Sequence, residues 1–247
     1  MKKICIIGLG NMGRAMLSLL NDRGEFDAKG CDKNDDINNT TKEADIVIIA
    51  VKPQSFREVC DVINIDLKNK LIISIMAGVS VEKIKNELEV DKVVRVMPNL
   101  PLKVGRGFSG WYCNSDVSDD EKELVRGILQ TFGEEIEVDT EEKIDQITAL
   151  SGSGPAYFYF LAELIEKAAV DYGFSQEEAK KIAKNTYVGS AELFAKENIS
   201  PEELRAKITS KGGTTQAALE YLQNNGFDKI FSGGIDAAKK RAKELNN

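Results

Sequence analysis

The chain has 247 residues, 33 of them basic and 40 acidic, so its formal net charge is −7, and it contains no histidine. Without histidine, a Ser-His-Asp triad, a histidine general base and a histidine-ligated zinc site are excluded. The acidic balance argues against duplex nucleic acid or an anionic membrane surface as a partner. Because the chain has no histidine, any proton transfer must use lysine, tyrosine, a carboxylate, a thiol, a hydroxyl or water.

The cysteines and the apolar runs bear on where the protein works. Cys5, Cys31, Cys60 and Cys113 show no CxxC spacing, so neither a disulfide framework nor a metal site is indicated. Cys5 and Cys31 can fall on neighbouring strands, where we expect two reduced core thiols. No apolar run approaches the ~18 residues of a membrane span, and polar residues interrupt the apolar start too soon for a signal peptide. We expect a cytoplasmic protein.

Short apolar runs alternate with helical patterns through the first half of the chain. Uniformly apolar strands separated by helices indicate a parallel sheet covered on both faces. The predicted strands are residues 4–8, 28–32, 45–51, 71–75 and 93–97, with extensions at 108–113 and 136–139, and the predicted helices are 11–20, 53–63, 81–88 and 119–132.

The connection between the second and third predicted strands is unusually short. Only 12 residues, KNDDINNTTKEA, separate Asp32 from Asp45, and they are polar. This is too little chain for the helix, strand and second crossover of a full first Rossmann half. Strand order places the missing strand at the edge of such a sheet, where its loss costs least. We therefore predict an α/β Rossmann-like parallel sheet domain trimmed at one edge.

Strand signals stop after about Thr140, and the remainder is predicted to be all-α. Pro155 begins a strongly apolar helix that Gly173 ends. Capping boxes open two more helices, and two further helices cover residues 214–224 and 228–245. The boxes pair Ser175 with Glu178 and Ser200 with Glu203.

The two halves predict two domains. We expect a dinucleotide-binding Rossmann domain at residues 1–140 and an all-helical substrate-binding and dimerisation domain at residues 141–247. The helix from Pro155 is apolar nearly all round, which fits burial between helices or against another subunit.

The first candidate site is a glycine-rich turn, GLGNMG, between a strand and a helix. Its glycines permit a tight turn and let the backbone approach a pyrophosphate at the helix N-terminus. Asp32 follows Gly13 by 19 positions and would bond the adenosine ribose hydroxyls, whereas Lys33 beside it would attract a 2′-phosphate, so both NADPH and NADH stay open as cofactors. Lys52 either lines the dinucleotide cleft or is a solvated loop cation. The expected cofactor-binding residues are Gly8, Gly10, Asn11, Met12, Gly13, Asp32, Lys33, Ala50, Val51, Lys52, Pro53 and Ala77.

The second candidate site is the run SKGGTT before the helix at 214–224. Two glycines before a helix expose backbone N–H groups at the positive end of its dipole, which suits a carboxylate or a phosphate. A plain N-cap would explain one threonine but not two. SGSGP at 151–155 lacks the ending of a phosphate loop, so close helix packing is the preferred interpretation. The expected substrate-binding residues are Gly212, Gly213, Thr214 and Thr215.

A Rossmann half followed by a helical half is also typical of β-hydroxyacid dehydrogenases. Those enzymes need a catalytic lysine with a nearby asparagine on the helix after the domain junction. Lys184 and Asn185 lie on the next helix instead, so a solvated helical lysine is the preferred interpretation.

Six segments together resemble Δ1-pyrroline-5-carboxylate reductase over nearly the whole chain. They are GLGNMGRA, DIVIIAVKPQ, IISIMAGVS, RVMPNLP, ALSGSGPAYFY and ITSKGGTTQAALEYL. The resemblance implies a Rossmann domain, a helical domain that forms an intertwined dimer or larger ring, and reduction of a cyclic imino acid to L-proline by NADPH or NADH, the last step of proline biosynthesis. Lys211 stands where the family usually has proline, and Leu100 where it usually has threonine.

The resemblance also implies a catalytic residue. Thr215, at the family's hydroxyl position, would hydrogen-bond the ring nitrogen directly or through water, while the helix start holds the carboxylate. A related imine or β-hydroxyacid reductase and a non-catalytic dinucleotide sensor are the alternatives. Reduction of pyrroline-5-carboxylate, tested with both cofactors, separates the three.

Overall fold

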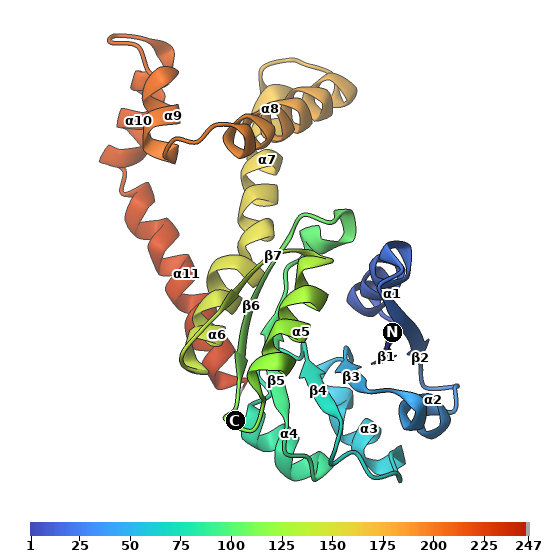
Figure 1. Ribbon diagram of the computed structural model, residues 1–247. Coiled ribbons are helices and arrows are strands. Elements are labelled where there is room, and N and C mark those ends of the chain that lie inside the picture. The colour runs from blue at the N-terminus through green and yellow to red at the C-terminus, as the bar shows by residue number, and fades with distance from the viewer. Residues whose placement is uncertain (246–247) are drawn as a thin grey trace. The chain divides into compact units, whose positions relative to one another are not determined.

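The computed structural model describes residues 1–245, and the chain divides into two compact units (Figure 1). Unit 1 contains Met1–Pro155 and the end of the last helix from Asp236, and unit 2 is Ala156–Ile235. Unit 1 therefore extends beyond residue 140, where the sequence predicts a functional boundary. The division into a cofactor domain and a substrate domain stays a prediction.

Unit 1 is built on a seven-stranded sheet in the order β2-β1-β3-β4-β5-β6-β7. The first five strands pair in parallel, β6 runs antiparallel to β5, and β7 is parallel to β6. The strands are β1 Lys2–Ile7, β2 Phe26–Cys31, β3 Ile46–Ile49, β4 Leu71–Ser74, β5 Val93–Met97, β6 Gly107–Cys113 and β7 Gly133–Glu137. The predicted Rossmann-like architecture is confirmed.

Alternating side chains along each strand bury two separate cores. In β1, Ile4 and Ile6 join one cluster, and Cys5 and Ile7 join the other. Successive side chains of a strand point to opposite faces, so an all-apolar strand needs helices on both sides. The first cluster packs against α1 (Asn11–Arg23) and α5 (Asp119–Gln130), and the second against α3 (Phe56–Val62) and α4 (Val81–Leu88).

The trimmed edge is confirmed, since β2 is the edge strand and connects to β3 through one short helix, α2 (Ile37–Glu43). The sequence prediction left this helix out, because its seven residues, INNTTKE, show little apolar periodicity. Its start is fixed by Asp36, whose Oδ1 accepts a hydrogen bond from the Asn39 amide at 3.0 Å.

The antiparallel β6 departs from the parallel order of the first five strands. The connection from β5 consists of little more than one 3₁₀ helix, η2 (Leu100–Val104). A parallel crossover needs a dozen residues or more, so this link returns the chain in the opposite direction. Trp111 of β6 is fully buried and donates from Nε1 to Glu135 of β7 at 2.6 Å.

A buried ion-pair network joins the sheet to α6 (Glu142–Ile147). Arg95 of β5 is 1% exposed and donates to Asp145 at 2.7 Å and to Glu141 at 2.9 Å. The same Glu141 oxygen accepts the Val81 amide at the start of α4 at 2.9 Å. Arg95 therefore links β5 to α6 through Asp145, and it links β5 to the start of α4 through Glu141. After α6 the chain forms one π-helical turn, η3 (Thr148–Gly152).

Unit 2 is helical, as predicted. It contains most of α7 (Gly154–Asp171), then α8 (Gln176–Lys196), α9 (Pro201–Lys207), α10 (Thr214–Asn224) and the first part of α11 (Phe227–Glu244). Both predicted capping boxes are present, at the starts of α8 and α9. No helix within residues 1–245 has the length and apolar character needed to cross a membrane.

Candidate functional site

The glycine-rich turn after β1 has three glycines in three different environments. Gly8 adopts a left-handed φ of +98°, which an L side chain rarely accepts. A Cβ on Gly13 would collide with the Gly8 carbonyl oxygen, so this glycine lets α1 pack against the turn. A Cβ on Gly10 would meet nothing within 4 Å, so this residue faces open space. These are the three roles that glycines have in a dinucleotide-binding turn.

The first turn of α1 is open to an anion. Gly10 is its N-cap and supplies no side-chain hydrogen bond, and no acidic residue lies in the first turn. Asn11, Met12 and Gly13 form that turn, and their amides sit at the positive end of the helix dipole. The predicted pyrophosphate position is therefore free of competing carboxylates and is suited to a diphosphate.

A cavity of ≈ 450 Å³ adjoins this turn at the carboxyl ends of β1, β2 and β3. Ligands of open α/β sheets bind at this edge. The cavity gathers residues from three separated segments, and its lining is more apolar than polar. Seven of the predicted cofactor residues line it: Gly8, Gly10, Asp32, Lys33, Ala50, Val51 and Lys52. Lys52 thus lines this cavity.

The other predicted cofactor residues lie next to this edge. Pro53 begins the 3₁₀ helix η1 (Pro53–Ser55) directly after Lys52. Ala77 lies in the turn after β4, beside the buried Gly78, whose missing side chain leaves room for Leu245. Unit 1 therefore brings all the predicted cofactor residues to the carboxyl ends of four neighbouring strands.

The acidic loop after β2 is ordered by its own carboxylates. The Lys33 amide donates to Asp32 Oδ1 at 2.9 Å, and the Asp32 amide donates to Asp35 Oδ2 at 2.8 Å. Asp36 caps α2, as described above. Sequence reasoning singled out Asp32 and missed Asp35 and Asp36, although all three stand in the same short polar run.

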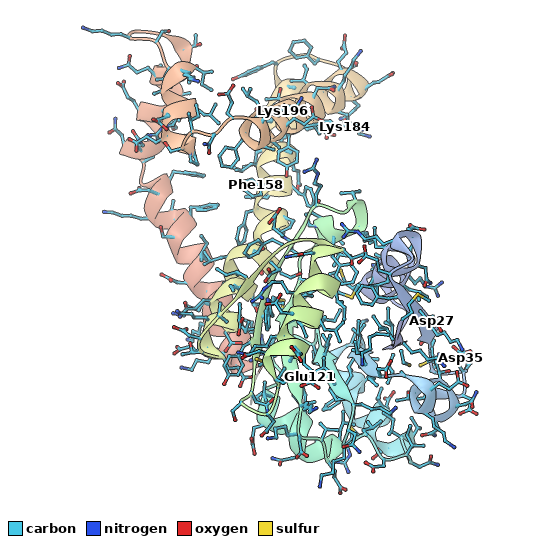
Figure 2. The ribbon with its side chains drawn as sticks, viewed as in Figure 1. Asp27, Asp35, Glu121, Phe158, Lys184 and Lys196 are labelled. Carbon is cyan, nitrogen blue, oxygen red and sulfur yellow. The ribbon has the colours of Figure 1, made fainter. Side chains whose placement is uncertain are left out.

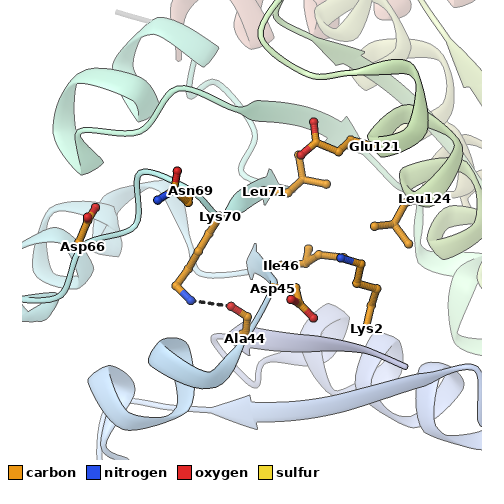
Figure 3. Close-up of a pocket in the computed structure, with 10 residues that line it drawn as sticks. All are labelled: Lys2, Ala44, Asp45, Ile46, Asp66, Asn69, Lys70, Leu71, Glu121 and Leu124. Carbon is orange, nitrogen blue, oxygen red and sulfur yellow. Dashed lines mark hydrogen bonds between the residues drawn. The ribbon is translucent and has the colours of Figure 1, made fainter.

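A second cavity, of ≈ 380 Å³, lies at the opposite edge of the sheet (Figure 3). Its lining includes Lys70, which donates to the Ala44 carbonyl at 2.6 Å, and Glu121, which pairs with Lys92 at 2.7 Å. It faces the amino ends of β1, β3 and β4, away from the glycine-rich turn. Lys70 and Glu121 already have partners inside the protein, and the cavity lies away from the glycine-rich turn, so it is not the candidate site.

The predicted substrate loop lies in unit 2, at the start of α10. Gly212 adopts a left-handed φ of +73°, and its amide donates to Gln216 Oε1 at 2.6 Å. The Gly213 amide donates to the Ser210 carbonyl at 3.0 Å. Both glycine amides are therefore engaged inside the loop. The two glycines therefore shape the loop. The backbone N–H groups that remain to bind a substrate are those at the start of α10.

Those remaining donors are the first amides of α10. Gly213 is the N-cap, and no side chain caps the helix in the part of the chain that the structure describes. The helix has no acidic residue in its first turn, and Thr214 and Thr215 are its first two residues. Two uncapped amides and two hydroxyls at a helix start are suited to holding a carboxylate.

Sequence reasoning missed one polar contact beside the sheet. Asn99, just after β5, donates to the Ser151 hydroxyl at 3.0 Å and accepts the Phe108 amide at 2.9 Å. A Cβ on Gly152 would lie 3.3 Å from the sulfur of Met97, so this segment packs closely, as predicted. Because Asn99 and Ser151 are far apart in the chain, no local pattern in the sequence pairs them.

The lysine and asparagine on α8 show no catalytic geometry. Asn185 donates from Nδ2 to the Lys181 carbonyl at 2.7 Å, and Lys184 is exposed on the same helix (Figure 2). These are ordinary features of a solvated helix face, in agreement with the sequence interpretation.

Comparison with known proteins gives matches over both halves of the chain. Residues 141–245 match the family model "Pyrroline-5-carboxylate reductase dimerisation", and residues 33–78 match "NADP oxidoreductase coenzyme F420-dependent". The pyrroline-5-carboxylate reductase of Aquifex aeolicus is 36% identical, over 98% of this chain and 97% of its own.

Two solved structures are similar over the full length. The pyrroline-5-carboxylate reductase of Coxiella burnetii is 32% identical with a TM-score of 0.88, covering 100% of this chain and 99% of its own. The pyrroline carboxylate reductase of Plasmodium falciparum, solved with NADP bound, is 30% identical with a TM-score of 0.87, covering 100% and 98%.

Proposed function

Because the chain belongs to the pyrroline-5-carboxylate reductase family, we propose which of its residues carry out the reduction and how they divide the work. The protein is an oxidoreductase that reduces Δ1-pyrroline-5-carboxylate to L-proline with NADPH or NADH, the last step of proline biosynthesis. It forms a homo-oligomer through its helical part. We propose a cytoplasmic location, because its relatives are biosynthetic enzymes.

Residues 1–140 would hold the cofactor and residues 141–247 the substrate and the second subunit. The observation that carries this proposal is the glycine-rich turn, where Gly10 faces open space at the uncapped start of α1. Gly8, Gly10 and the amides of Asn11, Met12 and Gly13 would hold the diphosphate, and Asp32 the adenosine ribose. Lys33, Ala50, Val51, Lys52, Pro53 and Ala77 would complete the cleft. The cofactor supplies the hydride when bound.

The substrate carries a carboxylate and a C=N bond, and the start of α10 offers a group for each. The amides of Thr214 and Thr215 would bind the carboxylate at the positive end of the helix, with Gly212 and Gly213 shaping the loop. The Thr215 hydroxyl would hydrogen-bond the ring nitrogen, directly or through water. This nitrogen must be, or become, protonated as the imine carbon is reduced.

No strong side-chain base is needed for this reaction, since a protonated imine is already an electrophile. The chain's contribution is to hold the substrate in a fixed orientation and to keep its nitrogen protonated. Positioning alone lowers a reaction barrier substantially. A chain without histidine can therefore catalyse this reduction.

The direct test follows NADH and NADPH oxidation with pyrroline-5-carboxylate and identifies proline as the product. Hydroxyisobutyrate-type substrates and other cyclic imines are measured alongside. We expect rapid turnover only with the five-membered imino acid. Cofactor binding without oxidation would indicate a dinucleotide sensor, and turnover confined to a hydroxy acid would indicate the related dehydrogenases.

The role of Thr215 is tested with a matched pair of variants. Thr215→Ala should lower kcat by about tenfold to a hundredfold, the cost of losing a hydrogen bond to a charged group, with little change in cofactor affinity. Thr215→Ser keeps the hydroxyl and should retain most of the activity. Equal kcat values for Thr215→Ala and the unchanged protein would remove Thr215 from the mechanism.

A further inference from the structure

The loop after β2 contains an excess of negative charge at the adenosine end of the cofactor cleft. Resting on the proposed function, we propose that residues 32–36 make this enzyme select NADH over NADPH. Asp32, Asp35 and Asp36 contribute three carboxylates within five residues, and Lys33 is the single cation among them. The two cofactors differ only in a 2′-phosphate on the adenosine ribose, which adds about two negative charges at neutral pH.

The location of the loop makes it the part of the chain that meets this phosphate. Asp32 and Lys33 line the ≈ 450 Å³ cavity together with Gly8 and Gly10 of the glycine-rich turn. In this architecture the acidic residue at the end of the second strand accepts hydrogen bonds from the ribose hydroxyls. A carboxylate favours a hydroxyl, which can donate, and repels a phosphate, which cannot.

Each of the three carboxylates accepts a hydrogen bond from a backbone amide. Asp32 accepts the Lys33 amide at 2.9 Å, Asp35 accepts the Asp32 amide at 2.8 Å, and Asp36 accepts the Asn39 amide at 3.0 Å. Each of these hydrogen bonds uses one carboxylate oxygen and a backbone donor, so all three negative charges remain on the loop. Figure 2 labels Asp35 within this loop.

The connection from β2 to α2 contains a single positive charge. The loop passes directly into α2, and the sequence from Asp32 to Asn39, DKNDDINN, contains one lysine and no arginine. The other cation that lines the cavity, Lys52, follows β3 and not β2. Lys33 is exposed and outnumbered three to one by the carboxylates. The loop therefore favours the cofactor with the lower negative charge.

The test measures cofactor binding directly, by calorimetric titration of the full-length protein without substrate. NADH and NADPH are compared, as are ADP-ribose and its 2′-phosphate, which isolate the adenosine end. We expect NADH to bind about tenfold more tightly than NADPH at low ionic strength, and the same order for the two fragments. The ratio should shrink as salt is added, because exposed charges are screened over about 10 Å at 0.1 M.

Asparagine substitutions separate charge from loop geometry. Asp32→Asn, Asp35→Asn and Asp36→Asn each keep an oxygen that can accept the same amide, and asparagine caps a helix as well as aspartate. The triple variant should lose the preference for NADH, with the affinity ratio moving about tenfold toward NADPH. Asp27→Asn removes one carboxylate near the start of β2, the same change as each single variant makes after the end of that strand, and should leave the ratio unchanged.

Several outcomes would overturn the inference. They are equal or tighter binding of NADPH by the unchanged protein, an unchanged ratio in a triple variant with native circular dichroism, and an equal shift in Asp27→Asn. The proposed function is judged separately, by proline formation. Preferred NADH binding without proline formation would contradict the proposed function alone, and proline formation with tighter NADPH binding would contradict this inference alone.

Discussion

At the scale of single residues, Gln216 connects the substrate loop to its helix. Its Oε1 accepts the Gly212 amide at 2.6 Å, and its Nε2 donates to Glu220 at 2.7 Å. The backbone of Gly212 is left-handed, so the loop depends on this hydrogen bond for its shape. Gln216 is therefore a positioning residue, because its side chain fixes the shape of the loop and is not proposed to contact the reacting atoms.

Gln216→Ala should loosen the loop and raise the KM for the imino acid. Losing one neutral hydrogen bond costs about 1 kcal/mol, so a rise of about fivefold is expected with a smaller change in kcat. Steady-state kinetics measure both constants. Gln223→Ala removes the same side chain near the other end of α10 and should change neither; an equal effect of the two variants would contradict the positioning role.

The Arg95 network makes a second prediction at the residue scale, this time on stability. Asp145→Asn removes one charge from a pair in which Arg95 is 1% exposed and Asp145 8%. Removing one of the two carboxylates that Arg95 contacts should cost about 1–3 kcal/mol, because Arg95 stays buried and keeps only Glu141, at 2.9 Å, as a partner. Urea unfolding followed by circular dichroism should show a correspondingly lower free energy of unfolding. The control is Asp139→Asn, whose exposed pair with Lys143 should contribute little.

At the scale of elements, the sequence predicts the starts of helices well and the course of the connections between strands poorly. The boxes Ser175–Glu178 and Ser200–Glu203 lie within four residues of chain, so the sequence contains the whole motif. The strand β6 reversed direction because of the length of its link, and no apolar pattern in β6 itself distinguishes parallel from antiparallel pairing. Local signals predict elements, while pairings such as Asn99 with Ser151 depend on contacts distant in sequence.

The candidate site divides in the same way. The residues of the glycine-rich turn follow from one contiguous motif, and the sequence prediction includes all of them except Leu9, which also lines the cavity. Asp35 and Gln216 were missed because their roles come from hydrogen bonds to backbone amides that only the folded loops bring close. A carboxylate or amide in a polar run has no periodicity that separates a loop-forming residue from a solvated one.

The capping box of α8 predicts a dependence of stability on pH. Hydrogen bonds from the Ser175 side chain and backbone hold the pKa of Glu178 below its ordinary value of 4.5. The charged form is therefore favoured in the folded state. Its contribution is complete above pH 4.5 and is lost as the pH falls through the lower pKa of the folded protein.

Glu178→Gln should remove that pH dependence while keeping an oxygen for the cap. The melting temperatures of the unchanged protein and of the variant, measured by circular dichroism from neutral pH to pH 3, should differ most at neutral pH and converge in acid. Ser175→Ala removes the cap itself and should lower stability by about 1 kcal/mol at neutral pH. Parallel curves for Glu178→Gln and the unchanged protein would contradict the assignment.

At the scale of the whole molecule, unit 2 has an unusual excess of exposed apolar side chains for a single chain. In α7, Phe158 is 53% exposed, Tyr159 50% and Phe160 58%. Figure 2 labels Phe158 on this helix. Apolar patches of this kind on a soluble chain are typical of association surfaces. An association surface on α7 explains why the helix from Pro155 is apolar nearly all round.

Light scattering at micromolar concentration should therefore give a dimer or a larger assembly. Phe160→Glu places a charge on this surface and should shift the assembly toward monomer, since an unpaired buried charge is strongly unfavourable. Glu166→Gln, a change in charge on the same helix away from these aromatic residues, serves as the control. A monomer from the unchanged protein would exclude the dimerisation role.

The burial of Trp111 in β6 has an optical consequence. It is the single tryptophan of the chain and lies in unit 1. The Cζ atom of Arg126 lies over its ring, 5.6 Å from the ring centre. Five of the six tyrosines lie in unit 2: Tyr157, Tyr159, Tyr172, Tyr187 and Tyr221. Indole emission excited at the red edge of absorption therefore reports on the sheet alone, and tyrosine signals report mainly on the helices, so a single unlabelled sample distinguishes the order in which the two units melt.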